Sequence, residues 1–276
     1  MLNDLELIKL ALAEDIGTGD ITTEAISSVV SAREASASLV ARESGVLSGS
    51  QLVHFVYSAL PGVVEVRFRS ADGARFDSGA TIADLRGDPK TILTGERLAL
   101  NLLSRMCGVA TRTRQLADLI SDTETEILDT RKTTPLWRKW EKRAVLHGGG
   151  VNHRMGLYDH VLVKDNHIRA AGGLRKALEA ARDGSSPVYK LEVEIESLAD
   201  LETAIELGAD WVMLDNMSPA DVKKGVEIAR GRVVLEASGG INASNIREYA
   251  ETGVDYVSSS EITQSARPLN LALDFH

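Results

Sequence analysis

The sequence predicts an α/β protein that consists of an N-terminal α/β sandwich domain and an incomplete (β/α) barrel of six to seven parallel strands. From about Thr125 onward, short apolar runs alternate with helical stretches at intervals of about twenty residues, a pattern typical of a parallel sheet covered by helices. Before that point, short β-branched or alternating segments are separated by Gly and Pro, which indicates a small sheet domain.

The N-terminal part is predicted to begin with an amphipathic helix. Residues 1–20 carry acidic side chains and lack the basic start and apolar centre of a secretion signal, so we expect no such signal. Short strands are predicted at residues 35–41, 46–48 and 63–69.

A long helix is predicted to link the two parts. Apolar positions recur with helical periodicity over residues 94–107, with Thr94 as the candidate N-cap. We therefore place the sandwich domain at residues 1–108, completed by the alternating segment 268–276, and the barrel at residues 109–267.

Six strand-like runs define the barrel. They lie at residues 126–129, 160–165, 190–196, 211–216, 233–238 and 255–260. Their regular spacing favours a barrel over an open Rossmann sheet, and the chain has no GxGxxG fingerprint that would support the latter.

The charge of the chain is unevenly distributed. The net charge of −9 argues against a nucleic-acid surface. Residues 129–169, in contrast, hold nine Lys or Arg against four Asp or Glu, which indicates a focused site for a small anion. The chain has one cysteine, Cys107, and no apolar run long enough to span a bilayer. We therefore expect a cytoplasmic protein without a membrane role.

Polar side chains follow the barrel strands at their carboxyl ends, where (β/α) barrels carry their active sites. The cationic candidates are Arg131, Lys132, His153, Arg154 and Lys164. The later strands end in Glu194, Asp215, Ser238 and Gly239. Guanidinium groups bind planar carboxylates, and carboxylates can hold Mg²⁺ directly or through water. This set therefore fits a reaction between an organic anion and a magnesium-bound polyphosphate.

The segment Ser238-Gly239-Gly240 is a candidate phosphate cradle. We expect a helix to begin near Asn242, so that backbone N–H groups at its start would face a terminal phosphate. A tight βα turn would give the same glycine pair.

Other polar residues have structural interpretations. Charged residues at helical spacing are expected on a solvated helix face; these are Arg138, Lys139, Lys142 and Arg143. Three histidines, His147, His160 and His167, are expected to be structural, the three tryptophans to pack, and Cys107 to be inert.

Five segments, in this order, resemble quinolinate phosphoribosyltransferase, also called carboxylating nicotinate-nucleotide pyrophosphorylase. They are TRKTTP (130–135), GGGVNHRMGLYDHVLVKDNHI (148–168), LEVEIES (191–197), MLDNMSP (213–219) and LEASGGI (235–241). Weaker similarity at residues 13–23 and 95–111 extends the resemblance over nearly the whole chain.

The resemblance implies an enzyme that joins quinolinate to the ribose of phosphoribosyl pyrophosphate in NAD synthesis, with Mg²⁺ as cofactor. It also implies a homodimer in which Arg97 reaches the partner's quinolinate. Five residues would line the quinolinate pocket: Arg131, Lys132, His153, Arg154 and Lys164. Glu194 and Asp215 would face the ribose and the metal. Lys132, Lys164, Glu194 and Asp215 form the catalytic set, and Ser238, Gly239 and Ser260 would hold the 5′-phosphate.

The chain departs from the family pattern at two places. Leu136 stands where the family usually has Gly, and Ser260, Glu261 and Gln264 alter a loop that usually resembles V-G-A-L-T-H-S. Three alternatives stay open: a ModD-type paralogue with another substrate, a non-catalytic binding protein, which Ser260, Glu261 and Gln264 suggest, and a Schiff-base aldolase, which the strand-end Lys164 suggests.

Overall fold

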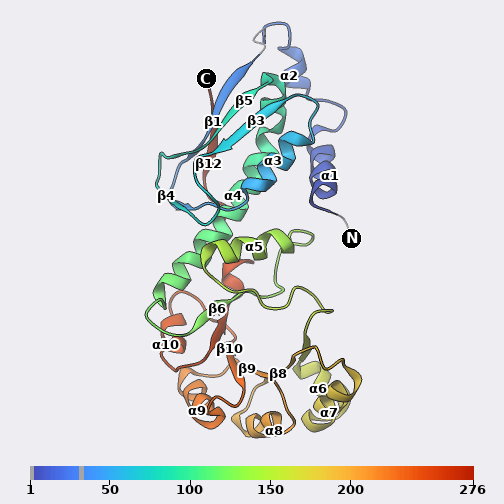
Figure 1. Cartoon of the computed structure of the whole chain (residues 1–276), viewed down its shortest axis with the longest axis vertical. Helices are drawn as coiled ribbons and strands as arrows, with labels where there is room; N and C mark the ends of the chain where they lie inside the picture. Colours follow the sequence, from blue (N-terminus) through green and yellow to red (C-terminus); the bar gives the residue numbers. More distant parts are fainter. Residues whose placement is uncertain (1–2, 31–33) are drawn as a thin grey trace. The chain divides into compact units, whose positions relative to one another are not determined.

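The computed structural model describes residues 3–30 and 34–276 (Figure 1). The chain divides into two compact units, one of Met1–Thr111 with Ala266–His276 and the other of Arg112–Ser265. The sequence placed the corresponding boundaries at residues 108 and 268. The candidate residues of the barrel all lie in the second unit, which therefore holds the site described below.

An antiparallel sheet with the strand order β12-β1-β5-β3 forms the centre of the first unit. Its strands are β1 (Ala35–Ala41), β3 (Val64–Phe68), β5 (Thr81–Gly87) and β12 (Leu271–Phe275), and a ribbon pairs β2 (Gly45–Val46) with β4 (Arg75–Phe76). Its helices include α1 (Asp4–Ile16), α2 (Ile21–Ala25) and α3 (Ser50–Ser58). Together they form the predicted mixed α/β domain.

Local sequence explains the elements of this unit. Helix α1 begins at a capping box, in which the Asn3 side chain accepts the Glu6 N–H at 2.9 Å and Glu6 accepts the Asn3 N–H at 2.7 Å. On β1, Ala37 and Leu39 are buried, and Leu39 pairs with Leu273 of β12. Strand β5, which the sequence analysis missed, lies between β1 and β3.

Helix α4 (Pro89–Leu119) begins earlier than predicted. The Asp88 carboxylate accepts the Thr91 N–H at 2.8 Å, which is the hydrogen bond of an N-cap. Pro89 then occupies the first turn, where a missing N–H has no cost. The prediction that Thr94 caps this helix is wrong, since the Thr94 hydroxyl donates to Asp20 at 2.9 Å.

A six-stranded parallel sheet with the order β6-β11-β10-β9-β8-β7 forms the second unit. The strands are β6 (Glu126–Leu128), β7 (Val161–Val163), β8 (Leu191–Ile195), β9 (Trp211–Asp215), β10 (Val234–Ser238) and β11 (Tyr256–Ser258). The connecting helices are α5 (Arg138–Gly148), α6 (Asp165–Ala171), α7 (Leu174–Gly184), α8 (Leu201–Glu206), α9 (Pro219–Ala229) and α10 (Ile246–Ala250). Helices α6 to α10 lie outside the strands (Figure 1), so the predicted incomplete barrel is confirmed.

The barrel is open between its edge strands. Within the described chain, β6 and β7 pair with β11 and β8 but not with each other. Val151 forms a parallel bridge with Leu128 instead. This bridge places residues 152–154 beside the end of β6. Across residues 3–30 and 34–276, no helix has the length and apolarity that a membrane span requires.

Candidate active site

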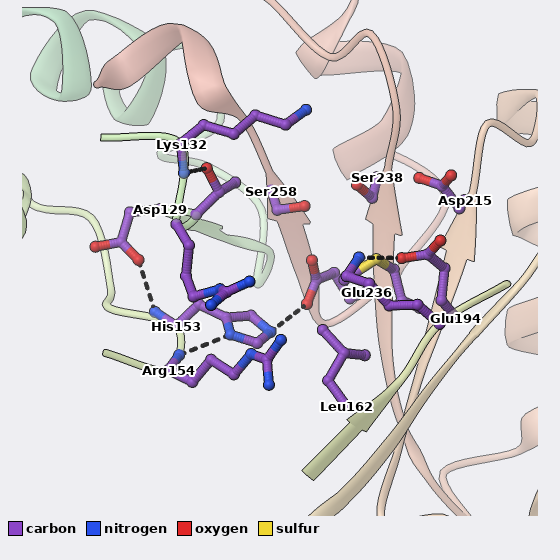
Figure 2. A pocket seen from close by; sticks show the side chains of 14 residues that line it. Asp129, Lys132, His153, Arg154, Leu162, Glu194, Asp215, Glu236, Ser238 and Ser258 are labelled. Carbon is purple, nitrogen blue, oxygen red and sulfur yellow. Dashed lines mark hydrogen bonds and ion pairs between the residues drawn. The ribbon is translucent and has the colours of Figure 1, made fainter. Parts of the chain in front are cut away.

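A cavity of about 290 Å³ opens at the carboxyl ends of the barrel strands (Figure 2). Its lining comes from every strand of the sheet or from the residues that follow it. The lining residues are Asp129, Thr130, Arg131, Lys132, His153, Arg154, Leu162, Lys164, Glu194, Met213, Asp215, Glu236, Ser238 and Ser258. Because parallel strands end on the same side of the sheet, residues far apart in the sequence meet here.

Two guanidinium groups face this cavity without a carboxylate partner. Among the described residues, neither Arg131 nor Arg154 has a carboxylate oxygen within 4.0 Å of its guanidinium, and the Arg154 guanidinium donates only to the carbonyl of His160, at 3.2 Å. Burial, and then the positive charge of Arg131, lower the pKa of Arg154. Two cations that repel each other beside a cavity favour the binding of an anion between them.

A buried ion pair fixes the segment that carries Arg154. Asp129 and Lys142 are 0% and 1% exposed and form a hydrogen-bonded ion pair. The Asp129 carboxylate also accepts the His153 N–H at 2.9 Å and the Asn152 amide at 2.7 Å. Lys142 donates to the His153 carbonyl at 2.9 Å. The expectation that Lys142 lies on a solvated helix face is therefore wrong. This lysine is buried, and its hydrogen bonds hold residues 152–154 in place.

Desolvation works against this ion pair. Burial raises the pKa of Asp129 and lowers the pKa of Lys142, and the attraction between the two charges opposes both shifts. The hydrogen bonds to residues 152 and 153 therefore help to stabilise the ion pair, and the ion pair in turn fixes the position of these residues.

A second ion pair lies on the other side of the cavity. Lys164 follows β7 and its ammonium group bonds to Glu194 at the end of β8. Glu194 is 8% exposed. The Lys164 N–H donates to His167 Nδ1 at 2.9 Å, which orders the start of α6. Of the three glutamates of β8 and its end, Glu194 lines the cavity, Glu192 is buried below it and Glu196 is exposed.

A cluster of two imidazoles and two carboxylates fills the barrel below the cavity. Glu192 Oε2 lies 3.0 Å from His153 Nε2 and 2.9 Å from His160 Nε2. Glu236 Oε2 lies 3.5 Å from the same nitrogen of His153 (Figure 2). Both glutamates are 0% exposed. Glu192 thus joins the two histidines that contact Arg154.

The His153 ring lies between the carboxylates of this cluster and the backbone of Arg154. The ligand atoms of His153, Glu192 and Glu236 lie within 4.8 Å of one another, close enough for one ion. The Arg154 N–H donates to His153 Nδ1 at 2.6 Å. Nδ1 therefore acts as an acceptor, and Nε2 faces Glu192 and Glu236. His153 Nε2 and the carboxylates of Glu192 and Glu236 lie at ion-pair distances, but among the described residues these buried atoms form no hydrogen bond of regular geometry.

The buried carboxyl of Glu236 should couple stability to pH. Burial, and then the charge of Glu192, raise the pKa of Glu236 from 4.5 to about 8. Between these two values the folded chain binds a proton that the unfolded chain releases, so this group makes stability fall as pH rises. We expect Glu236→Gln to remove that loss and to raise the free energy of unfolding by roughly 2–4 kcal/mol above pH 8.

Urea unfolding of both proteins at pH 5.5, 7 and 9 measures this difference. The gap between the two proteins should widen with pH. Parallel stability curves would show that Glu236 titrates normally.

A second cavity of about 480 Å³ adjoins the first. Thr130, Lys132, Asp215, Ser238 and Ser258 line both. Gly239, Gly240 and Ser260 line the second only. Gly239 has a φ of 99°, and a Cβ there would lie 2.3 Å from Asn216 Oδ1, so only glycine fits this turn.

The expected helix start near Asn242 is wrong. Helix α10 begins at Ile246, and three N–H groups before it already have partners. Asn242 donates to the Asn245 side chain at 2.8 Å, Ser244 donates to the Asn242 side chain at 2.9 Å, and Ala243 donates to Glu261 at 3.2 Å. The Gly240 and Ile241 N–H groups have no partner among the described residues, so the cradle is shorter than predicted.

Leu136 adopts a backbone conformation that favours glycine. Its φ is 68° and its side chain is 71% exposed. A left-handed backbone costs a residue with a Cβ about 1–2 kcal/mol. We expect Leu136→Gly to raise the free energy of unfolding by about 0.5–1 kcal/mol, after the extra entropy of the unfolded glycine chain is subtracted. Denaturant titration would test this, and a loss of stability would mean that the Leu136 side chain makes contacts worth more than the strain.

The structure brings most of the predicted site residues together. Those around the first cavity are Arg131, Lys132, His153, Arg154, Lys164, Glu194, Asp215 and Ser238. Arg97 lies exposed on α4 in the first unit and lines neither cavity. Sequence reasoning noted Glu192 and Glu236 on their strands but did not assign them to the site, and it placed Lys142 on a solvated helix face. The sequence feature that could have identified the two glutamates is a carboxylate within a run of apolar strand residues, which indicates a buried charge.

Comparisons with known proteins agree over both units. Residues 109–274 match the C-terminal domain of quinolinate phosphoribosyl transferase, and residues 20–107 match its N-terminal domain. A probable nicotinate-nucleotide pyrophosphorylase (carboxylating) of Bacillus subtilis is 39% identical, over 99% of this chain and 94% of its own length. The Mycobacterium leprae enzyme of that name is 39% identical, over 99% of this chain and 100% of its own.

A solved structure shows the same likeness in three dimensions. The nicotinate-nucleotide pyrophosphorylase from Francisella tularensis superposes with a TM-score of 0.94 and 39% identity, covering 100% of this chain and 98% of that one. The two domain matches together cover most of the chain, and the full-length relatives are above 30% identity. The chain belongs to the quinolinate phosphoribosyltransferase family.

Proposed function

We propose that this protein transfers the 5-phosphoribosyl group from phosphoribosyl pyrophosphate to quinolinate, with release of pyrophosphate and carbon dioxide, to give nicotinate mononucleotide in the cytoplasm. The observation that carries the proposal is the pair of guanidinium groups without carboxylate partners, Arg131 and Arg154, beside a cavity lined by Ser and Gly, in a member of this family. The first cavity accepts a planar dianion, and the second accepts a phosphorylated sugar.

Quinolinate binds in the first cavity. Arg131 and Arg154 pair with its two carboxylates, and Lys132 adds a third positive charge at the rim. His153 acts through its neighbour, because Nδ1 accepts the Arg154 N–H and Nε2 points to Glu192. Both ring nitrogens of His153 face other protein groups. We therefore propose that His153 contacts quinolinate through the edge of its ring or through its backbone.

The phosphoribosyl donor spans both cavities. Its 5′-phosphate lies against Ser238, Gly239 and Ser260, and its ribose lies near Asp215, which lines both cavities. Lys164 and Glu194 lie between the ring and the sugar. Their ion pair keeps each side chain in a fixed position, and this orients the two substrates.

The chemistry requires orientation and charge balance more than a nucleophile on the protein. The pyridine nitrogen forms a bond to C1 of the ribose as the bond from C1 to pyrophosphate breaks. The ring becomes cationic. It can therefore accept the electron pair of the C–C bond that breaks when the adjacent carboxylate departs as carbon dioxide. A proton then takes the place of that carboxylate. Glu194 and Asp215 stabilise the positive charge that develops on the ribose.

Mg²⁺ is the proposed cofactor. The carboxylates of Glu194 and Asp215 line the same cavity, and two carboxylates with open space for substrate oxygens and water are the donor set that Mg²⁺ prefers. These two residues would hold the ion directly or through water. When bound, it would neutralise the charge of the departing pyrophosphate.

The proposed assembly is a homodimer with shared active sites, which the family resemblance implies for Arg97, an exposed residue of α4. We expect Arg97→Ala to be inactive alone and partly active in mixed dimers with an inactive Lys164→Ala chain. In such a dimer one site has both wild-type residues. Co-purified mixed dimers with two affinity tags allow this measurement, and the absence of any rescue would contradict the shared site.

The direct test of function is a product assay. Purified protein is mixed with quinolinate, phosphoribosyl pyrophosphate and Mg²⁺, and nicotinate mononucleotide is separated and quantified. We expect product with quinolinate, and none when EDTA is added. The proposal fails if no product forms with quinolinate.

The same assay with nicotinate or other pyridine acids tests the paralogue alternative. The aldolase alternative lacks support in the site, because Lys164 is held in an ion pair whereas a Schiff-base lysine must present a free amine.

A further inference from the structure

Glu261 places a carboxylate at the wall of the second cavity, where a phosphate is proposed to bind. Its two oxygens are both engaged. Oε1 lies 2.5 Å from Arg112 of α4, and Oε2 accepts the Ala243 N–H at 3.2 Å. Both charged side chains are 27% exposed. Arg112 itself lines neither cavity, so it reaches the cavity wall only through Glu261.

Glu261 lies within a set of bonds that joins the segments of this cavity. The Ser259 hydroxyl donates to the Ile241 carbonyl at 2.6 Å, and the Thr263 hydroxyl donates to the Lys132 carbonyl at 2.9 Å. The contact between Glu261 and Ala243 joins the same two segments as the Ser259 bond, residues 258–265 and residues 238–244. We call these two segments, which carry Ser238, Gly239 and Ser260, the phosphate cradle.

We propose that Arg112 and Glu261 are a pair of positioning residues that makes the phosphate cradle of this chain competent to bind an anion. Glu261 holds the two segments of the cradle together. Arg112 cancels the negative charge that this bridge would otherwise place beside the phosphate. The inference rests on the proposed function, because that function places the 5′-phosphate of the donor in this cavity.

The charges give the pair an asymmetric signature. Without Arg112, Glu261 is an uncompensated anion on the cavity wall, and it repels the phosphate. Without Glu261, Arg112 is an uncompensated cation nearby, and it does not repel the phosphate. If the pair contributed only to folding, loss of either partner would weaken binding similarly, and loss of both would be no better than loss of one.

The test uses Arg112→Gln, Glu261→Gln and the double variant of the full chain. The affinity for phosphoribosyl pyrophosphate is measured by titration calorimetry at low salt, and its KM and the KM for quinolinate are measured in the product assay. A matched control is the exposed pair Arg232 and Glu202, bonded at 2.8 Å, changed to Gln in the same three combinations. Neither control residue lines either proposed substrate cavity.

We expect Arg112→Gln to weaken the binding of phosphoribosyl pyrophosphate by about tenfold, and to do so less at high salt. The double variant should return to within about threefold of the wild type. Both charges are then gone, and the glutamine that replaces Glu261 still offers an oxygen to the Ala243 N–H. Glu261→Gln alone should bind at least as tightly as the double variant. The KM for quinolinate should stay within about twofold in all three, and the control variants should not change either substrate.

Two results would overturn the inference. One is a double variant as weak as Arg112→Gln, and the other is an equal loss of affinity for both substrates, since either would indicate a general structural role. Inorganic phosphate, titrated without turnover, separates this question from the proposed reaction. If the wild type makes no nicotinate mononucleotide but the variants change phosphate affinity in the stated order, the inference stands while the proposed function fails.

Discussion

Replacing Arg154 by alanine is expected to raise the KM for quinolinate by on the order of 10²–10³-fold, because a paired, charge-assisted contact to a carboxylate is lost. The Arg154 guanidinium faces the cavity without a carboxylate partner and is held by the His160 carbonyl at 3.2 Å. The KM for phosphoribosyl pyrophosphate should change by less than about threefold. Initial rates over a range of each substrate, with the other saturating, measure both constants.

The conservative variant Arg154→Lys sharpens this prediction. A lysine keeps the charge but not the planar pair of donors, so it should recover only part of the loss. Arg175→Ala, at a 58% exposed arginine of α7, is the matched control. Equal increases in both KM values would contradict the assignment of Arg154 to the quinolinate half of the site.

Replacing Lys142 by alanine is expected to lower the free energy of unfolding by about 3–5 kcal/mol, because it leaves the buried carboxylate of Asp129 without its counter-charge. The same change loosens residues 152–154, since Lys142 also donates to the His153 carbonyl. Variants that still fold should therefore bind quinolinate more weakly. Urea unfolding followed by circular dichroism, together with the KM for quinolinate, measures both effects.

A second variant separates charge from packing. Lys142→Met combined with Asp129→Asn removes both charges, keeps most of the volume and leaves an oxygen that can accept the His153 N–H. It should recover at least half of the lost stability. Lys223→Ala, at an exposed position of α9, serves as the control. A Lys142→Ala protein as stable as this control would show that Asp129 is protonated and needs no partner.

The barrel could be predicted because parallel strands covered on both faces are nearly continuous apolar runs. All six runs become strands, and the polar residues at their ends line one cavity because the topology brings those ends together. Strand β5 escaped prediction because its sequence, TIADLRG, does not alternate regularly: the buried Ile82 and Ala83 are adjacent, and Asp84 then precedes the buried Leu85. One of its sheet partners, β1, is separated from it in sequence by α3 and β3.

Burial and pairing of charged side chains could not be predicted. Lys142 has the helical spacing of a surface residue, and periodicity gives the face of a helix but not what covers that face. The short apolar run around Glu192 predicts a strand, but not that two histidines from other segments reach this carboxylate. The hydrogen bond from the Arg154 N–H to His153 Nδ1 depends on local backbone geometry, which the sequence pattern does not give. The ion pair between Glu261 and Arg112 likewise joins residues that are far apart in the sequence, so the sequence pattern does not indicate it.

The proposed reaction loses one specific carboxylate, so the most direct measurement follows labelled carbon. Quinolinate labelled in the carboxylate next to the ring nitrogen is converted by the purified protein in parallel with quinolinate labelled in the other carboxylate. We expect the first to release labelled carbon dioxide in equal amount to nicotinate mononucleotide and pyrophosphate, and the second to keep its label in the product. Release from the second, or product formed without release from the first, would contradict the proposed function.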